Sequence, residues 1–256
     1  MKKTEQFLMR IGISPELRIE CTEEFLQSVQ YHAVTSIPYE NLDILAKKSL
    51  RLDSEALFEM IVQRERGGYC FELNGILSWF YKSLGFTVHD YFARFLRNEE
   101  GIPMCRHRVL SVECEGKLYF CDIGIGQKAP RYPRVMEEGY VQEQFGETYK
   151  FEKDTDLGWV LYDLHAGTWR PFISFTEEKK YEVDFIQPSF YCEAHPASPF
   201  NKAPILSIKT KDGRKTINGR DFKMFSGEEV IYIEENISDA RMKAILEKEF
   251  HLEEEA

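Results

Sequence analysis

The sequence has no long apolar run, no paired cysteines and no surplus of basic residues, and each absence argues against a class of protein. Without roughly 18 consecutive apolar residues, a membrane-spanning helix is not expected. The six cysteines are scattered and none forms a CxxC pair, so neither a zinc site nor a disulfide framework is expected. The formal net charge of −10 disfavours a nucleic-acid-binding protein. No apolar stretch follows the N-terminal lysines, so we expect no secretory signal and a cytoplasmic protein.

Helical periodicity dominates the first third of the chain. Apolar residues recur at helical spacing over 23–33, 54–62 and 70–84. Thr22 and Ser54 precede two of these segments and are expected to cap them, because their hydroxyls can accept a free backbone N–H of the first turn.

Strand patterns replace the helical ones after residue 85. The segments 106–113 and 118–125 are expected to pair around a turn at Glu115–Gly116. The prolines at 188–199 indicate a linker, and Ser238 is expected to cap a last helix. Further strands are expected at 86–95, 158–164, 168–175, 205–210 and 230–234. Helices followed by strands, rather than alternating with them, predict an α+β fold.

Cys70 stands out among the cysteines because it begins a predicted helix directly after the segment RGGY. The two glycines allow a tight turn, and the free N–H groups of a helix start favour a thiolate. The same N–H groups could hold a developing oxyanion. The alternative is a buried structural cysteine, which is the usual role of this residue.

His107 and Asp122 are the expected partners of Cys70, since a cysteine nucleophile needs a base and the base needs an orienting group. With Glu115 and Gly116 at the turn centre, His107 faces Gly124, and Asp122 lies two residues away on the same face. An odd-length turn would separate the two side chains. In that case Asp122 would cap a turn and His107 would be an exposed strand-end residue.

At these residues the chain strongly resembles the arylamine N-acetyltransferases. The matching segments are SIPYENLDI (36–44), RGGYCFELN (66–74), HRVLSVE (107–113), LYFCDIGIG (118–126) and HPASPF (195–200). They follow the family's order and cover essentially the whole chain, as in a bacterial-type member.

The resemblance implies both a fold and a reaction. It implies a helical domain over 1–85 carrying the nucleophile, a β-barrel domain over 86–198 carrying the histidine and aspartate, and an α/β lid over 199–256, with a cysteine-protease-like core. It implies a catalytic triad of Cys70, His107 and Asp122 in an enzyme of xenobiotic metabolism. The reaction would be ping-pong: Cys70 takes an acetyl group from acetyl-CoA and passes it to an aromatic amine or hydrazine, without a metal.

Further residues are expected around these substrates. Six Lys or Arg residues and two Asp lie within 209–223, and Arg214 and Lys215 are the expected contacts of the CoA phosphates; a solvated hairpin is the alternative. The expected acceptor pocket is lined by Tyr69, Phe71, Phe95 and Ile125, although buried aromatic residues are more often core. Ile125 stands where the family commonly has phenylalanine.

Two other functions remain open at the level of sequence. A hydrolase, of the protease or transglutaminase type, could use the same order of Cys, His and Asp. A non-catalytic homologue could bind acyl or aromatic molecules on the same fold. No membrane or nucleic-acid partner is expected.

Overall fold

The structure is a computed structural model that describes residues 1–97 and 101–253. The helices are α1 (Lys3–Arg10), α2 (Glu23–Ser36), α3 (Leu42–Leu45), α4 (Ser54–Leu57), α5 (Cys70–Ser83), α6 (Ile186–Ala194) and α7 (Asp239–Phe250), with the short helical turns η1 (Phe58–Gln63), η2 (Gly126–Lys128) and η3 (Glu182–Phe185). The strands are β1 (Thr87–Phe95), β2 (His107–Cys114), β3 (Lys117–Cys121), β4 (Arg134–Val135), β5 (Gln142–Gln144), β6 (Glu147–Asp154), β7 (Gly158–His165), β8 (Thr168–Phe175), β9 (Ile205–Lys209), β10 (Gly213–Asn218), β11 (Asp221–Ser226) and β12 (Glu229–Glu234).

The larger sheet is a nearly closed barrel. Its strand order is β4-β3-β2-β1-β8-β7-β6-β5, so its two edge strands are β4 and β5. A side chain joins these edges: Gln142 Oε1 accepts from the Val135 N–H at 2.7 Å, and Gln142 Nε2 donates to the Val135 carbonyl at 3.0 Å. The amide thus stands in for the backbone ladder that would close the barrel.

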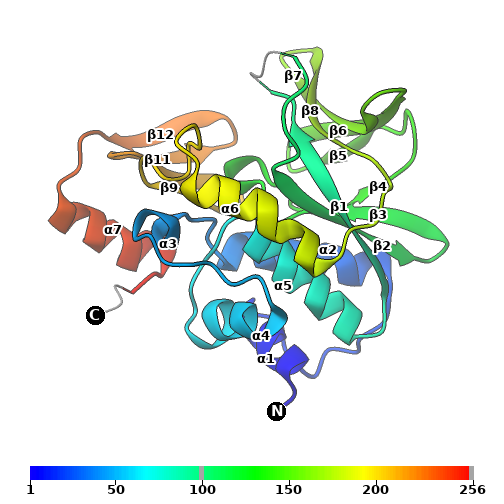
Figure 1. Ribbon diagram of the computed structural model, residues 1–256, viewed down its shortest axis with the longest axis horizontal. Helices are drawn as coiled ribbons and strands as arrows, with labels where there is room; N and C mark the ends of the chain where they lie inside the picture. Colours follow the sequence, from blue (N-terminus) through cyan, green and yellow to red (C-terminus); the bar gives the residue numbers. More distant parts are fainter. Residues whose placement is uncertain (98–100, 254–256) are drawn as a thin grey trace.

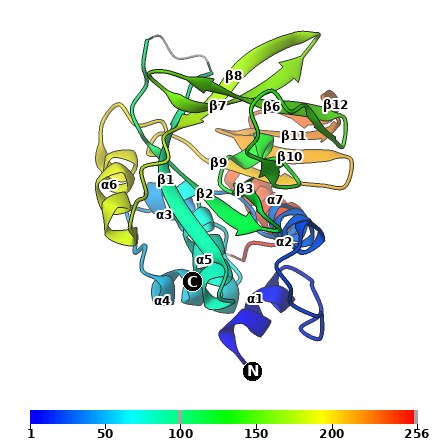
Figure 2. The same ribbon diagram turned by 90° about the vertical axis from the view of Figure 1, so that its right-hand side faces the viewer.

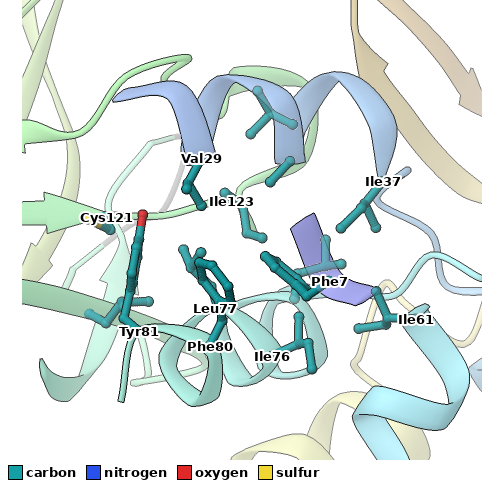
Figure 3. Close-up of a cluster of buried hydrophobic side chains, with 14 of the residues drawn as sticks. Phe7, Val29, Ile37, Ile61, Ile76, Leu77, Phe80, Tyr81, Cys121 and Ile123 are labelled. Atoms are coloured by element: carbon teal, nitrogen blue, oxygen red, sulfur yellow. The ribbon is translucent and has the colours of Figure 1, made fainter. Parts of the chain in front are cut away.

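The core that positions the site lies between the N-terminal helices and this sheet. Figures 1 and 2 show α5 running alongside β1 and β2, with α2 beside it. Figure 3 shows side chains from α1, α2 and α5 meeting in this core. Phe7 and Phe80 are fully buried, with ring centroids 4.5 Å apart. The burial of these apolar side chains anchors α5, and therefore Cys70, against the sheet.

The smaller sheet lies beside α3 and has the strand order β12-β11-β10-β9. It packs against α7, whose Ile245 and Phe250 are buried among its apolar side chains. A two-way backbone exchange ties it to the loop before α3: the Tyr39 N–H donates to the Ser207 carbonyl at 2.8 Å, and the Ser207 N–H donates to the Tyr39 carbonyl at 2.9 Å.

Several predicted elements are confirmed. Thr22 caps α2 by accepting the Phe25 N–H at 3.2 Å, and Ser238 caps α7. β2 and β3 pair around Glu115 and Gly116, both at positive φ. The α+β class is likewise confirmed.

Two predicted features are wrong. The cap of α4 is Asp53, one residue before Ser54, because the Asp53 carboxylate accepts the Ala56 N–H at 3.1 Å. The proline-marked linker contains the helix α6. Pro188 lies in its first turn, where a missing N–H costs nothing, so it does not interrupt the helix.

The division into domains at residues 85 and 198 stays a prediction. In the described part of the chain, no helix combines the length and apolarity needed to span a bilayer.

Candidate active site

Cys70 is the first residue of α5. Its predecessor Tyr69 is the N-cap, and the Tyr69 N–H donates to Glu72 Oε2 at 3.0 Å. This bond, from the cap to a carboxylate three residues on, fixes where the helix begins. The Cys70 side chain is buried, and its Sγ lies 4.0 Å from the carbonyl oxygen of Arg106, the residue before β2.

The electrostatic setting of Cys70 differs from the sequence-based expectation. Burial raises the pKa of the Cys70 thiol well above its ordinary value, and nearby Cys192 and Asp122 raise it further. Backbone hydrogen bonds at Arg108 and Phe71 oppose this effect without cancelling it. Burial therefore disfavours the thiolate form of Cys70, and a base that takes the thiol proton would favour it.

His107 and Asp122 lie together as predicted. His107 Nε2 is 2.6 Å from Asp122 Oδ2, and both side chains are fully buried. The β2–β3 register is the one expected from a turn centred at Glu115–Gly116. Within the described residues, His107 Nδ1 has no hydrogen-bond partner. With Nε2 engaged by Asp122, Nδ1 is the ring nitrogen that can accept a proton.

Asp122 is itself held by groups that the sequence analysis did not single out. Its Oδ1 accepts from Asn74 Nδ2 and from the Gly124 N–H, both at 2.8 Å. Its backbone N–H donates to Gln30 Oε1 at 3.2 Å. Asn74 and Gln30 are buried polar residues on helix faces that otherwise pack in the core. A polar residue on an apolar helix face is the sequence signal that could have identified them as partners of a buried group.

Gly124 allows the segment after β3 to approach the start of α5. A Cβ at this position would lie 2.7 Å from Cys70 Cα and 2.9 Å from Asn74 Nδ2. Any larger residue would push the Asp122 segment away from Cys70. The Asp-x-Gly spacing is therefore a packing requirement of the site.

A buried ion pair supports the turn before Cys70. Arg66 Nη2 lies 2.8 Å from Glu40 Oε1 and 3.1 Å from Asp43 Oδ1. Burial raises the pKa of the Glu40 carboxyl, and the Arg66 cation opposes this shift. The Glu40 N–H donates to the Gly68 carbonyl at 2.9 Å. Glu40 thus braces the glycine turn, whereas Glu72 serves the helix cap.

The four predicted pocket residues differ in burial. Tyr69 and Phe71 are fully buried, and the Tyr69 hydroxyl lies 2.6 Å from Ser189 Oγ. The Phe95 ring is half-buried, with its centroid 4.7 Å from that of His107. Ile125 is also half-buried. The structure therefore brings Phe95 next to His107 and leaves Tyr69 and Phe71 in the core beneath Cys70.

Arg214 and Lys215 lie on β10, in the smaller sheet. The Arg214 side chain is buried, stacks 3.9 Å over the Phe225 ring and donates to the Gly227 carbonyl at 2.8 Å. Lys215 Nζ pairs with Glu249 at 2.8 Å. Their contact with CoA stays a prediction. Across 1–97 and 101–253, no cluster of three or more His, Cys, Asp or Glu is arranged to hold a metal.

Comparison with known proteins gives one family throughout. A sequence profile described as N-acetyltransferase matches residues 22–256. The arylamine N-acetyltransferase of Mycobacterium tuberculosis is 34% identical over 206 residues, which cover 78% of this chain and 72% of the relative.

Solved structures agree. The arylamine N-acetyltransferase of Mycobacterium smegmatis matches with a TM-score of 0.90 at 30% identity, over 99% of this chain and 93% of that one. The arylamine N-acetyltransferase of Mycobacterium marinum in complex with CoA matches with a TM-score of 0.89 at 26% identity, over 97% and 92%.

Proposed function

Since the chain belongs to the arylamine N-acetyltransferase family and is an acyltransferase, we propose that it transfers an acetyl group from acetyl-CoA to an aromatic amine or hydrazine through a thioester on Cys70. The observation that carries this proposal is the buried His107–Asp122 pair beside the first residue of α5. The M. marinum structure with CoA supports the donor.

The first half-reaction begins with proton transfer from the Cys70 thiol to His107 Nδ1. The thiolate attacks the thioester carbonyl of acetyl-CoA, and backbone N–H groups at the start of α5 stabilise the oxyanion. When the carbon–sulfur bond to CoA breaks, the leaving CoA thiolate takes the proton from Nδ1. The enzyme then carries acetyl-Cys70 and a neutral His107.

The second half-reaction reverses these roles. The amine nitrogen of the acceptor attacks the acetyl carbonyl and gives up a proton to His107 Nδ1. Collapse of the tetrahedral intermediate expels the Cys70 thiolate, which is reprotonated by His107. The products are the N-acetylated acceptor and the free enzyme.

Asp122 acts through His107. A carboxylate at 2.6 Å from Nε2 keeps the proton on that nitrogen, so Nδ1 carries the lone pair that faces the reaction. It also stabilises the imidazolium formed in each half-reaction. Because the thiol pKa is raised by burial, this stabilisation has to supply the thiolate.

The substrate contacts complete the proposal. Phe95 and Ile125 would line the acceptor pocket, with Tyr69 and Phe71 shaping it from below, while Arg214 and Lys215 would meet the CoA phosphates. All six cysteines are unpaired, which supports a reducing, cytoplasmic location. In this proposal, Cys70, His107 and Asp122 form a cysteine-protease-like core used for acyl transfer.

Intact-protein mass spectrometry after mixing with acetyl-CoA alone tests the intermediate, with Cys70→Ala as the control. We expect a gain of about 42 Da, the mass of one acetyl group in a covalent intermediate, which disappears when an aromatic hydrazine is added. Loss of the acetyl group at the same rate without an acceptor would instead indicate a hydrolase. No adduct together with no alkylation of Cys70 would indicate a non-catalytic binding protein.

A further inference from the structure

Cys21 and Cys114 lie in contact with each other, and the acyl transfer reaction uses neither of them. Cys21 Sγ donates to the Glu113 carbonyl at 3.4 Å, across 92 positions of the chain. The thiol of the next residue, Cys114, is hydrogen-bonded to the Cys21 thiol. Cys114 belongs to the core between the N-terminal helices and the larger sheet, and Cys21 packs against this core. Two thiols that touch in the folded chain can be joined by oxidation.

Hydrogen bonds between α2 and the β2–β3 turn hold the two cysteines in place. Cys21 lies two residues before α2, and Cys114 is the last residue of β2. The Glu23 N–H donates to Glu115 Oε2 at 3.0 Å, and the Tyr119 hydroxyl donates to Glu23 Oε2 at 2.8 Å. The start of α2 is therefore fixed against the end of β2, and the two sulfurs stay close in the folded protein.

The two thiols differ in their access to solvent. Cys21 is half-buried, whereas Cys114 is only 4% exposed. Burial raises the pKa of the Cys114 thiol, and the contact with Cys21 raises it further. An oxidant in solution thus meets Cys21 first, and Cys114 can react afterwards with the sulfur beside it.

We propose that Cys21 and Cys114 are a redox pair, which a low-molecular-weight disulfide of the glutathione type converts into an intramolecular disulfide. In the first step, the Cys21 thiolate attacks one sulfur of the small disulfide, and one small thiol leaves. In the second step, Cys114 gives up its proton and attacks the Cys21 sulfur, and the second small thiol leaves. The two protein thiols lose two electrons together, and the small disulfide is reduced to two thiols.

The new disulfide would staple two elements that position the candidate active site. Helix α2 carries Gln30, whose Oε1 accepts the Asp122 N–H at 3.2 Å, and β2 begins at His107. A link that closes a loop of roughly 90 residues stabilises the fold by restricting the unfolded chain. In a reducing compartment the pair stays as two thiols, and it closes when the supply of reductant fails. This role does not depend on the acyl transfer reaction.

Incubation of the full chain with glutathione disulfide tests the redox pair, at about pH 8.5, where an ordinary thiol is half ionised. Mass spectrometry of the unreduced peptides should show Cys21 joined to Cys114, with a loss of about 2 Da for the two hydrogens. Dithiothreitol should restore both thiols.

Cys105 provides an internal control, because it is half-buried like Cys21. The charged groups around it are Arg94, Lys180 and Glu178, and these cannot exchange with a disulfide. We therefore expect Cys105 to remain a mixed disulfide with glutathione under the conditions that link Cys21 to Cys114.

Three variants make the outcome specific. Cys114→Ser should trap Cys21 as a mixed disulfide, with a gain of about 305 Da for one glutathione. Cys21→Ser should leave Cys114 unmodified, because that thiol is buried. Cys121→Ala removes a fully buried thiol on β3 and should form the same link as the wild type.

Thermal unfolding measures the stapling effect. Oxidation should raise the unfolding midpoint of the wild type by at least about 4 °C more than that of Cys21→Ser, which lacks the link. Accumulation of glutathione on Cys21 in the wild type would overturn the proposal, because the two sulfurs would then be unable to meet. An unmodified Cys21 beside a modified Cys105 would overturn it too, because the Cys21 thiol would then be out of reach of the oxidant.

Discussion

Asn74 Nδ2 lies 2.8 Å from Asp122 Oδ1, so the helix that begins with Cys70 also holds the carboxylate that orients His107. The other end of the same amide accepts the Ile123 N–H at 2.9 Å. One side chain, a single helical turn after Cys70, therefore fixes the distance between α5 and the segment after β3. Positions of the proposed nucleophile and base are coupled through it.

Asn74→Ala should slow acetylation of Cys70 by about 10- to 100-fold, because it removes one of the two donors to Asp122 Oδ1 and leaves the buried Ile123 N–H without a partner. Single-turnover acetylation, followed by mass spectrometry, measures this. Asn218→Ala, at an exposed position of β10, is the control and should react as the wild type. An Asn74→Ala protein that folds and acetylates at the normal rate would remove the positioning role.

His107→Gln should lower the rate of iodoacetamide alkylation at Cys70 by at least about tenfold at neutral pH. Burial raises the pKa of this thiol, so without a base it would ionise only well above about pH 8.5, the ordinary value for cysteine. Rates between pH 6 and 10, assigned to Cys70 by peptide mapping, provide the test. His89→Gln, which affects only the pair with Glu113, is the matched control.

Gly124→Ala should lower stability by about 1–3 kcal/mol and slow acetylation of Cys70, because the new Cβ would meet the Cys70 backbone at 2.7 Å. Gly139→Ala is the comparison: its φ of 74° carries strain, yet nothing lies within 4 Å of its Cβ. Urea unfolding would compare the stability of the two variants, and single-turnover kinetics would compare their rates of Cys70 acetylation. Equal effects on both readouts would mean that close packing at Gly124 does not matter.

Lys215→Ala should raise the KM for acetyl-CoA about three- to tenfold and leave kcat unchanged, if its ammonium meets a CoA phosphate. Glu249→Gln removes the partner of Lys215 but keeps the cation, so it should not raise KM. Steady-state rates at a saturating acceptor concentration decide. An unchanged KM in Lys215→Ala would discard this donor contact. Arg214 is less suited to the test, because its contacts with Phe225 and Gly227 also stabilise the hairpin.

The sequence was sufficient for the parts of the site that depend on local rules. The helix start at Cys70 follows from the glycine turn before it, and the meeting of His107 with Asp122 follows from the Glu115–Gly116 turn, which sets the strand register. The family motifs identified the family correctly.

Contacts between distant segments could not be read in this way. Gln30 reaches Asp122 across 92 positions of the chain, and Tyr69 reaches Ser189 across 120. The prolines around α6 look like a linker because composition does not show that Pro188 falls in a first turn. Burial of Tyr69 and Phe71 likewise depends on α6 and η3, which the sequence patterns did not reveal.

Lys209 provides a prediction on pH and stability that is independent of catalysis. Burial lowers the pKa of its ammonium to about 8, although Glu147 at 2.9 Å opposes this shift. The unfolded chain keeps an ordinary lysine pKa of about 10.4, so between these values the unfolded state binds more protons than the folded state. Stability contributed at this residue therefore rises as the pH increases from 8 towards 10.4, and it is lowest below pH 8.

Lys209→Met removes this titration while keeping the length of the side chain. The free energy of unfolding of the wild type, relative to Lys209→Met, should increase by about 1 kcal/mol between pH 7 and pH 9. Urea unfolding of both proteins at the two pH values measures it, and the cysteine and tyrosine titrations that the proteins share cancel in the difference. A difference that stays constant would show that Lys209 keeps its ordinary pKa in the folded chain, with Glu147 offsetting burial completely, and a difference that falls would show that its pKa is raised.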